Sequence, residues 1–340
     1  MVSIVDIARA VGLSDKTVSR VVNKEANVKP ETVRRVEEAI QALGYVPNLG
    51  ARMTRTNKSR TFGILTDFIS TTPYSGEIVR GIQSWAHANG RTILLANTDG
   101  DPEREKDAWR TFREHRIDGV LYVTMYHRIV EFSGESLPIP TVLVNCRAEH
   151  GSAIPSVTPD DAGGSAFLTE FLLRKGHRRI AYIRLNPSLH GAEQRFHAFE
   201  AVVTARGVPR DDILVRIGMT GPVGAEENRV FDIAAAIFSA PQRPTAVMCG
   251  NDEMAMQVYL AALTAGLKIP ADVSIVGFDD FRTISIGLKP QLTTAALPYF
   301  DLGHQGAERL DRVLSGERLD PINLSLPCKL VERGSCRDIR

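Results

Sequence analysis

The chain is poor in cysteine and contains no long apolar run. Its 340 residues include only four cysteines, which lie far apart and form no Cys-x-x-Cys pair: Cys146, Cys249, Cys328 and Cys336. That spacing disfavours a disulfide framework and a zinc site, and it leaves buried thiols as the simpler interpretation. No stretch of 18 or more apolar residues is present, which excludes an ordinary membrane-spanning helix.

Several signatures of catalysis are also missing. No Gly-x-Gly-x-x-Gly or Gly-x-x-x-x-Gly-Lys phosphate loop occurs, and the histidines show no His-x-x-x-His spacing suited to a metal. Asp160-Asp161 and Asp279-Asp280 are adjacent acids that need not share a face, and the first pair can cap the helix that follows. We therefore expect no enzymatic activity, no cofactor and no metal ion.

The N-terminus lacks the pattern of an export signal. It reaches Asp6 without a basic segment followed by an apolar one, which argues against a secretory signal peptide. We expect the protein to act in the cytoplasm.

Charge is distributed unevenly along the chain, although the net charge is only +1. Residues 1–60 contain eleven Lys and Arg against six Asp and Glu, whereas the remaining 280 residues contain thirty against thirty-four. A small basic head on a mildly acidic body is a hint of nucleic-acid binding at one end, although many basic ends are only solvated faces.

The head has the pattern of three short helices. Apolar residues at helical spacing begin at Ile4 and stop at Gly12, and Ser14 is a good N-cap for a second helix. Pro30 begins a third helix that Gly44 closes. Residues 49–60 then form a basic connector without an obvious core.

The first two helices predict a helix-turn-helix whose second helix enters the major groove of DNA. Lys16 and Arg20 are four residues apart and can reach guanine, whereas Thr17, Ser19 and Asn23 suit phosphate contacts. Asp15 either accepts from a cytosine amine or offsets the helix dipole. The alternative is a small helical domain that docks on a protein.

From residue 61 onward, short apolar runs alternate with amphipathic helical segments. This alternation predicts an α/β fold with parallel sheets flanked by helices, and roughly 270 residues are enough for two lobes with a ligand cleft between them. The expected elements lie at 62–66, 76–89, 92–96, 103–114, 120–124, 141–145, 161–174, 180–183, 193–206, 228–238, 246–248, 253–265, 273–278 and 300–314.

Together these motifs resemble the LacI/GalR family of bacterial transcription repressors from Ile4 to about Arg333. The head motif Asp6-Ile7-Ala8…Val11-Gly12-Leu13-Ser14…Thr17-Val18-Ser19-Arg20-Val21-Val22-Asn23 is highly specific for that family. Further segments in family order are Gly44–Asn48, Asp101–Glu105, Arg116–Val120, Lys175–Ile180, Arg243–Val247, Asn251-Asp252, Ser274–Asp280 and Leu292–Thr294.

The resemblance implies an all-α helix-turn-helix head at residues 1–47, a hinge at 48–60 and a two-lobed sensor at 61–340, like the periplasmic sugar-binding proteins. We place the N-lobe at about 61–158 and 291–317, and the C-lobe at about 160–288 and 321–335. The three chain crossings are then expected near 158–160, 288–291 and 317–321.

In this family the hinge becomes a short helix on specific DNA, and a leucine from it wedges into the minor groove. The corresponding DNA-contacting residues here are Ala51, Arg52, Met53 and Thr54. Thr54 occupies the wedge position, so either Met53 takes that role in a slightly rotated hinge or the kink is weaker. Gly50 also costs the hinge helix about 1 kcal/mol relative to alanine.

The resemblance also carries over effector-binding residues. Arg195 resembles the arginine that grips a pair of sugar hydroxyls, and Asp279 resembles the carboxylate that accepts from them. Asn251 and Asn145 are further polar contacts, and Tyr74 and Tyr299 could supply aromatic walls. A guanidinium that donates two parallel hydrogen bonds, a carboxylate that accepts two, and amides that do both suit the hydroxyl groups of a polyol.

These features predict a dimeric repressor that binds a pseudo-palindromic operator in double-stranded DNA and senses a small polar effector, expected to be a sugar. The effector either induces or corepresses. A tetramer is less favoured because residues 331–340 contain no leucine heptads. The alternatives are a transport-type sugar-binding protein, which the head disfavours, and an enzyme acting on a sugar.

Overall fold

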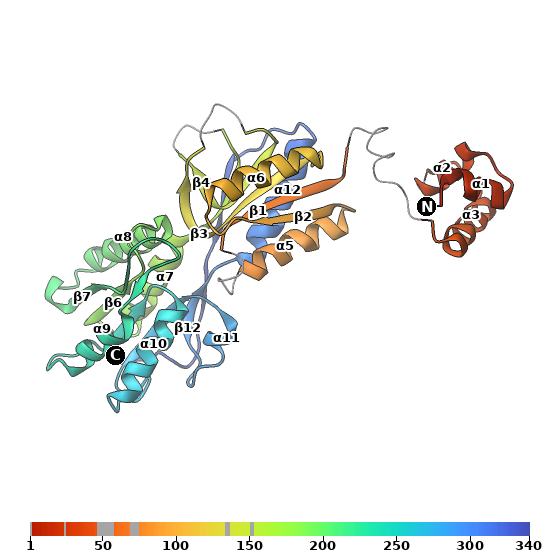
Figure 1. The fold of residues 1–340 in the computed structure, drawn as a ribbon. Coiled ribbons are helices and arrows are strands. Elements are labelled where there is room, and N and C mark those ends of the chain that lie inside the picture. Colours follow the sequence, from red (N-terminus) through yellow and green to blue (C-terminus); the bar gives the residue numbers. More distant parts are fainter. Residues whose placement is uncertain (1, 24, 46–57, 69–74, 133–136, 150–152) are drawn as a thin grey trace. The chain divides into compact units, whose positions relative to one another are not determined.

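The computed structural model describes residues 2–23, 25–45, 58–68, 75–132, 137–149 and 153–340. They form two compact units, residues 1–59 and residues 60–340 (Figure 1). The predicted hinge residues Ala51, Arg52, Met53 and Thr54 and the predicted wall residue Tyr74 lie outside the described residues.

The head consists of helices α1 (Ile4–Val11), α2 (Asp15–Val22) and α3 (Pro30–Leu43). Ser3 and Asp6 form a capping box on α1, and the Ser14 hydroxyl accepts from the backbone N–H of Thr17 at the start of α2. Gly12 and Gly44 end α1 and α3 with φ of 64° and 63°, a conformation that favours glycine. All of the expected helix ends in the head are confirmed.

A compact apolar core holds the three helices of the head together. Its buried members come from all three helices and from the residue after α3: Ile7, Ala8, Val18, Val21, Val36 and Tyr45. The α2 residues in this core are Val18 and Val21, which leaves Asp15, Lys16 and Arg20 exposed.

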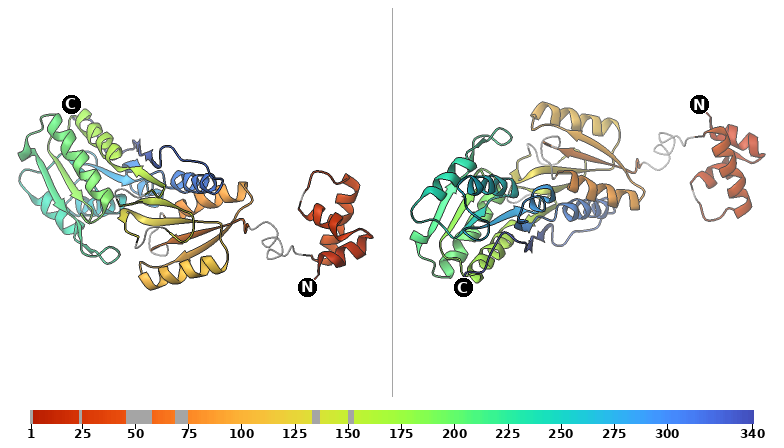
Figure 2. Two further views of the ribbon diagram at one scale, coloured as in Figure 1. Left: turned by 90° about the horizontal axis from the view of Figure 1, so that it is seen from above. Right: turned by 90° about the horizontal axis from the view of Figure 1, so that it is seen from below.

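The body contains two six-stranded sheets, which define its two lobes (Figure 2). In the N-lobe every pairing is parallel, in the order β13 (Asn323–Pro327), β5 (Ser156–Asp160), β4 (Thr141–Ala148), β3 (Gly119–Val130), β1 (Thr61–Thr66) and β2 (Thr92–Asn97). In the C-lobe the order is β14 (Lys329–Val331), β12 (Thr293–Ala296), β11 (Ser274–Asp279), β10 (Ala246–Cys249), β6 (Ile180–Arg184) and β7 (Ile213–Ile217). Only the β12–β14 pairing of that sheet is antiparallel.

Helices cover both faces of each sheet, as the alternating pattern predicts. In the N-lobe, α5 (Ser75–Ala88) and α12 (Tyr299–Leu314) pack on one face, and α6 (Pro102–Glu114) packs on the other (Figure 1). In the C-lobe, α7 (Asp161–Arg174) and α8 (His190–Ala205) cover one face, and α9 (Val230–Ser239) and α10 (Asp252–Thr264) cover the other. Short elements complete the lobe: a 3-10 turn at Arg210–Asp212, α11 (Arg282–Ser285), and the hairpin strands β8 (Met219–Thr220) and β9 (Glu227–Asn228).

Two of the three expected chain crossings between the lobes are wrong. The first falls where expected, at Asp160, between β5 and α7. The second follows β12, because β12 pairs with β11 in the C-lobe, and the third follows β13, because β13 pairs with β5 in the N-lobe. The lobe to which each strand belongs is set by its hydrogen-bonded partner, which local periodicity does not specify.

The described helices are all too short or too polar to cross a bilayer.

Candidate functional site

The first candidate surface is the outer side of α2 in the head. Asp15, Lys16 and Arg20 are exposed, and the Arg20 guanidinium is 3.6 Å from the Glu25 carboxylate. Asp15 lies in the first turn of α2, where an acid interacts favourably with the helix dipole. The three longest polar side chains of the predicted recognition helix are therefore accessible to a partner.

The three smaller polar residues of α2 are partly buried and engage locally. The Thr17 hydroxyl is 2.9 Å from that of Ser14, and the Asn23 amide donates to the backbone carbonyl and the hydroxyl of Ser19. Thr17, Ser19 and Asn23 thus stabilise both ends of α2, and their predicted phosphate contacts remain predictions.

The second candidate site is a cleft between the two lobes of the body. Its inner part, which we call the inner chamber, has a volume of about 40 Å³. Five of the predicted effector residues line it: Asn145, Arg195, Asn251, Asp279 and Tyr299. Residues separated by up to 154 positions in the chain therefore meet in one place: Asn145 comes from β4, Arg195 from α8, Asn251 and Asp279 from the ends of β10 and β11, and Tyr299 from the start of α12.

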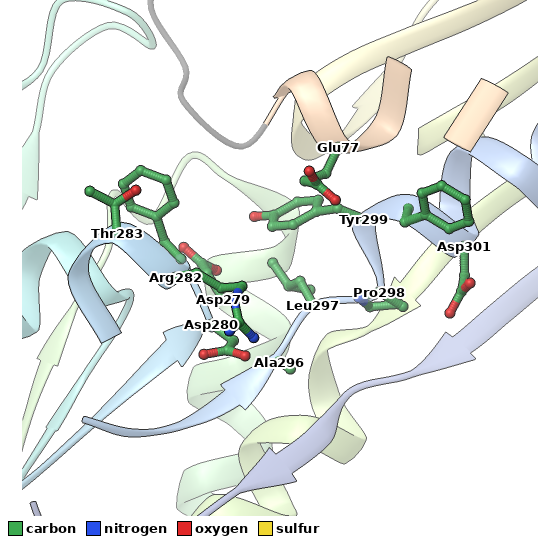
Figure 3. Close-up of a pocket in the computed structure, with 12 residues that line it drawn as sticks. Glu77, Asp279, Asp280, Arg282, Thr283, Ala296, Leu297, Pro298, Tyr299 and Asp301 are labelled. Atoms are coloured by element: carbon green, nitrogen blue, oxygen red, sulfur yellow. The ribbon is translucent and has the colours of Figure 1, made fainter. Parts of the chain in front are cut away.

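A larger cavity of about 500 Å³, the outer chamber, shares Asp279, Leu297 and Tyr299 with the inner one. Figure 3 shows the Glu77 carboxylate beside the Tyr299 ring, with Asp279 below and the backbone of residues 296–299 along the floor. The two chambers are therefore neighbours, and Asp279, Leu297 and Tyr299 line both of them.

Arg195 is held by acceptors from three elements of the C-lobe. Its Nε donates to the Asp161 carboxylate at 2.6 Å, and its Nη1 donates to the Gly250 carbonyl at 2.7 Å. Nη1 also lies 3.6 Å from Asp279. The guanidinium is stacked over the Phe278 ring, 3.8 Å from its centroid. These contacts fix the orientation of the fork that is predicted to grip the effector.

The two carboxylates beside Arg195 differ in their electrostatics. Burial alone would raise the pKa of Asp161, but the Arg195 guanidinium and His127 outweigh it and hold the pKa at about 2. Burial raises the pKa of Asp279 well above its usual value, and Arg195 only partly opposes this shift. Asp161 is therefore the permanent ionised partner of Arg195, whereas burial disfavours the charged form of Asp279.

The backbone is strained at two of the predicted residues. Asn145 has φ of 60° and Asp279 has φ of 113°, in the left-handed region that non-glycine residues rarely adopt. Such strain, costing on the order of 1–3 kcal/mol, concentrates at ligand sites. Both residues line the inner chamber.

Both predicted amides also have structural duties. Asn145 donates to the carbonyls of Thr124 and Met125 at 2.9 and 3.2 Å. The side-chain oxygen of Asn251 accepts from the backbone N–H of Met254 at 2.8 Å and so caps α10. Both side chains therefore stabilise the fold, and an effector contact from either stays a prediction.

Sequence reasoning missed two residues of the inner chamber's polar network, Asp161 and His127. The expected helix cap is Asp160, which accepts from Gly163, whereas Asp161 is fully buried and binds Arg195 and His127. The doublet at the strand–helix junction was the only available signal, and nothing in the sequence linked it to His127 on β3.

The family models match both units of the chain. Residues 3–48 match bacterial regulatory proteins of the lacI family, and residues 169–336 match a periplasmic binding protein-like domain. The chain is 33% identical over 337 residues to the ribose operon repressor of Escherichia coli (strain K12), covering 98% of this chain and 100% of that protein. It is 32% identical over 342 residues to catabolite control protein A of Priestia megaterium, covering 99% of each.

Solved structures agree with this assignment. A LacI-family transcriptional regulator from Rhizobium etli is 56% identical, with a TM-score of 0.79 over 82% of this chain and 100% of that one. The lac repressor dimer bound to operator and an anti-inducer is 25% identical, with a TM-score of 0.79 over 99% of both chains.

A helix-turn-helix head combined with a two-lobed binding domain defines the class of DNA-binding transcriptional regulators with a periplasmic-binding-protein-like sensor. The chain belongs to the lacI family of bacterial regulatory proteins.

Proposed function

We propose that the protein is a repressor whose affinity for its operator is controlled by a sugar bound in the cleft of the body. The convergence of Arg195, Asp279 and the two asparagines on one chamber carries this proposal. Together these groups offer a planar guanidinium donor, a carboxyl group and two amides, which suit the paired hydroxyls of a polyol.

The relatives support the same effector class. The ribose operon repressor of E. coli takes its name from a sugar operon. A LacI-type regulator from Alkaliphilus metalliredigens, 25% identical to this chain with a TM-score of 0.65, was solved with D-xylulofuranose. We therefore place the effector among neutral sugars.

Control of DNA binding follows from linkage. An effector shifts the operator equilibrium only by its difference in affinity between the DNA-bound and DNA-free states, and DNA shifts effector affinity by the same factor. An effector that prefers the DNA-free state induces, and one that prefers the DNA-bound state corepresses.

Two heads on a two-fold dimer would read a pseudo-palindromic site. In support of a homodimer, α10 carries Met256, Leu260 and Leu263 at helical spacing, 37%, 51% and 58% exposed. An apolar stripe of this kind on a surface helix is typical of an interface. We infer that a second copy of the chain covers it.

We propose that the protein acts in the cytoplasm, where its operator DNA lies. We also propose that it acts by binding DNA and sugar and does not convert the bound sugar. The lacI-family relatives are transcriptional regulators.

A mobility-shift assay with the full chain across candidate inverted repeats tests this function. We expect one repeat to be bound far more tightly than scrambled DNA of equal length, and a sugar to change that affinity. Equal affinity for all sequences would contradict operator recognition, and hydrolysis or isomerisation of the sugar by the purified protein would favour an enzyme instead.

A further inference from the structure

His127 is a buried residue of the inner chamber with one unused ring nitrogen. The residue is 7% exposed and lies on β3, in the N-lobe. Its Nδ1 is 2.6 Å from Oδ2 of Asp161. Its Nε2 is buried and has no hydrogen-bond partner among the described residues. A buried polar atom left unpaired costs about 1–3 kcal/mol, so each such atom in a folded protein calls for a partner or another explanation.

An irregularity in β3 brings His127 to this place. The β3–β4 pairing shifts register between Val123 and Arg128, as in a bulge that re-aims side chains. The irregular segment is held by side chains: the Asp67 carboxylate accepts from the backbone N–H of Met125 at 2.9 Å and from Arg128 at 2.8 Å. His127 therefore leaves the regular ladder and meets α7 and α8 of the other lobe.

The start of α8 approaches the His127–Asp161 pair closely. A Cβ added at Gly191 would lie 3.2 Å from Oδ2 of Asp161 and 3.2 Å from Cβ of His127. The His190 ring packs edge-on against the His127 ring, with 5.1 Å between centroids. The imidazole is thus held by Asp161 at its Nδ1 atom and by the neighbouring His190 ring.

Asp161 determines which proton the ring carries. One carboxylate oxygen accepts from Arg195 and the other accepts from His127. An ionised carboxylate can only accept, so Nδ1 of the ring carries a proton and donates to it. In the tautomer that donates through Nδ1, Nε2 is the acceptor, and it can accept from an occupant of the chamber.

We propose that Nε2 of His127 accepts a hydrogen bond from a hydroxyl group of the effector. The effector is then connected through His127 and Asp161 to Arg195, in a chain that begins in the N-lobe and ends in the C-lobe. Because Nε2 is an acceptor, this position selects a neutral hydroxyl over a carboxylate or phosphate oxygen. The inference rests on the proposed sugar-binding function.

The competing interpretation is that His127 only anchors Asp161. Two substitutions separate these roles, since each keeps one half of the imidazole. His127→Asn leaves an amide near the Nδ1 position, where it can still donate to Asp161, and removes the Nε2 atom. His127→Gln leaves an amide near the Nε2 position and loses the contact with Asp161.

The experiment is titration calorimetry on the full-length protein and both variants. The probes are D-ribose, D-glucose, D-galactose and cellobiose, each compared with an acidic counterpart (ribose 5-phosphate, D-glucuronate, D-galacturonate and cellobionate). We expect the tightest wild-type ligand to be a neutral sugar. Its affinity should fall about tenfold in His127→Asn and stay within about threefold in His127→Gln, because one hydrogen bond to Nε2 is at stake.

The opposite order, with His127→Asn close to wild type and His127→Gln weakened, would overturn the contact and leave His127 as an anchor. A preference of the wild type for an acidic counterpart would overturn the hydroxyl assignment. If no probe binds the wild type, the proposed effector class itself fails, and that failure is visible before any variant is measured.

Discussion

The guanidinium of Arg195 and the carboxylate of Asp161 form a buried ion pair, with side chains only 7% and 0% exposed and 2.6 Å between Nε and Oδ1. It joins the first residue of α7 to the second turn of α8, directly behind the chamber. Removing one partner of a buried pair leaves a desolvated charge without compensation.

Arg195→Ala is therefore expected to lower the free energy of unfolding by about 3–5 kcal/mol and to abolish effector binding. Urea unfolding followed by circular dichroism measures the first effect. Arg206→Ala is the matched control, because its ion pair with Glu170 lies just beyond the same helix at the surface, where such pairs contribute little. Similar losses for both variants would contradict the role assigned to the buried pair.

Asp252 predicts an unusual pH dependence of stability. Burial raises its pKa from 3.8 to about 7, although Thr294 and the backbone of Phe281 donate to its carboxylate. Between these two values the folded chain holds a proton that the unfolded chain has released. The contribution of this group to stability therefore falls as pH rises from about 4 to about 7 and stays low above that.

Asp252→Asn removes this titration and can keep both hydrogen bonds, because the Thr294 hydroxyl can accept as well as donate. The free energy of unfolding of the variant minus that of wild type should rise across the same window, by at most about 1.4 kcal/mol per pH unit. Denaturant titrations at pH 5, 6, 7 and 8 measure it. A difference that does not change with pH would rule out the shifted pKa.

Lys16→Ala tests base reading by α2. Loss of a base contact should weaken binding to the preferred operator by about 1–3 kcal/mol and change scrambled DNA far less. Competition mobility shifts at fixed salt measure both affinities. Arg34→Ala, at an exposed ion pair with Glu38 on α3, should preserve the ratio. An equal loss on all sequences after Lys16→Ala would assign Lys16 to a phosphate instead.

The Phe68 ring lies against Gly100 in the N-lobe and against Gly224 between β8 and β9 in the C-lobe. An added Cβ would lie 2.8 Å from this ring at Gly100 in the N-lobe and 2.9 Å from it at Gly224 in the hairpin. Gly224→Ala should therefore push the ring away, separate the lobes and lower the melting temperature.

Gly221→Ala is the control for that substitution. Gly221 also has a positive φ, of 105°, but a Cβ added there would have its nearest heavy atom 3.6 Å away. Only the backbone penalty of placing alanine at positive φ, on the order of 1 kcal/mol, therefore applies. Small-angle scattering and thermal unfolding compare the two variants. Equal effects would show that Phe68 does not restrain the lobes.

Leu263→Glu tests the apolar stripe on α10. A buried charge at the centre of a dimer interface should convert the protein to monomers, because the carboxylate would lose its hydration without a partner. Sedimentation velocity measures the change. Phe167→Glu, which alters a similarly exposed apolar residue on α7 (59% exposed), should leave the assembly intact. A dimer that survives Leu263→Glu places the interface elsewhere.

Features that depend on neighbouring residues were readable in the chain. Ser14 and Gly12 set helix ends through their own hydroxyl and backbone conformation, so the head was predicted to the residue. Arg195 and Asp279 were found from a family motif, and the alternation of strands and helices predicted two α/β lobes.

Features that depend on pairing between separate segments could not be read from the sequence. The crossings after β12 and β13 follow from hydrogen bonds to β11 and β5, and nothing local in the sequence specifies which strand each of them pairs with. The same holds for His127 and Asp161, which are 34 residues apart and come from different lobes. Their contact, and the unpaired Nε2 atom of His127, arise only when the two lobes pack against each other. Burial and hydrogen-bond partners are properties of the folded molecule and not of a sequence segment.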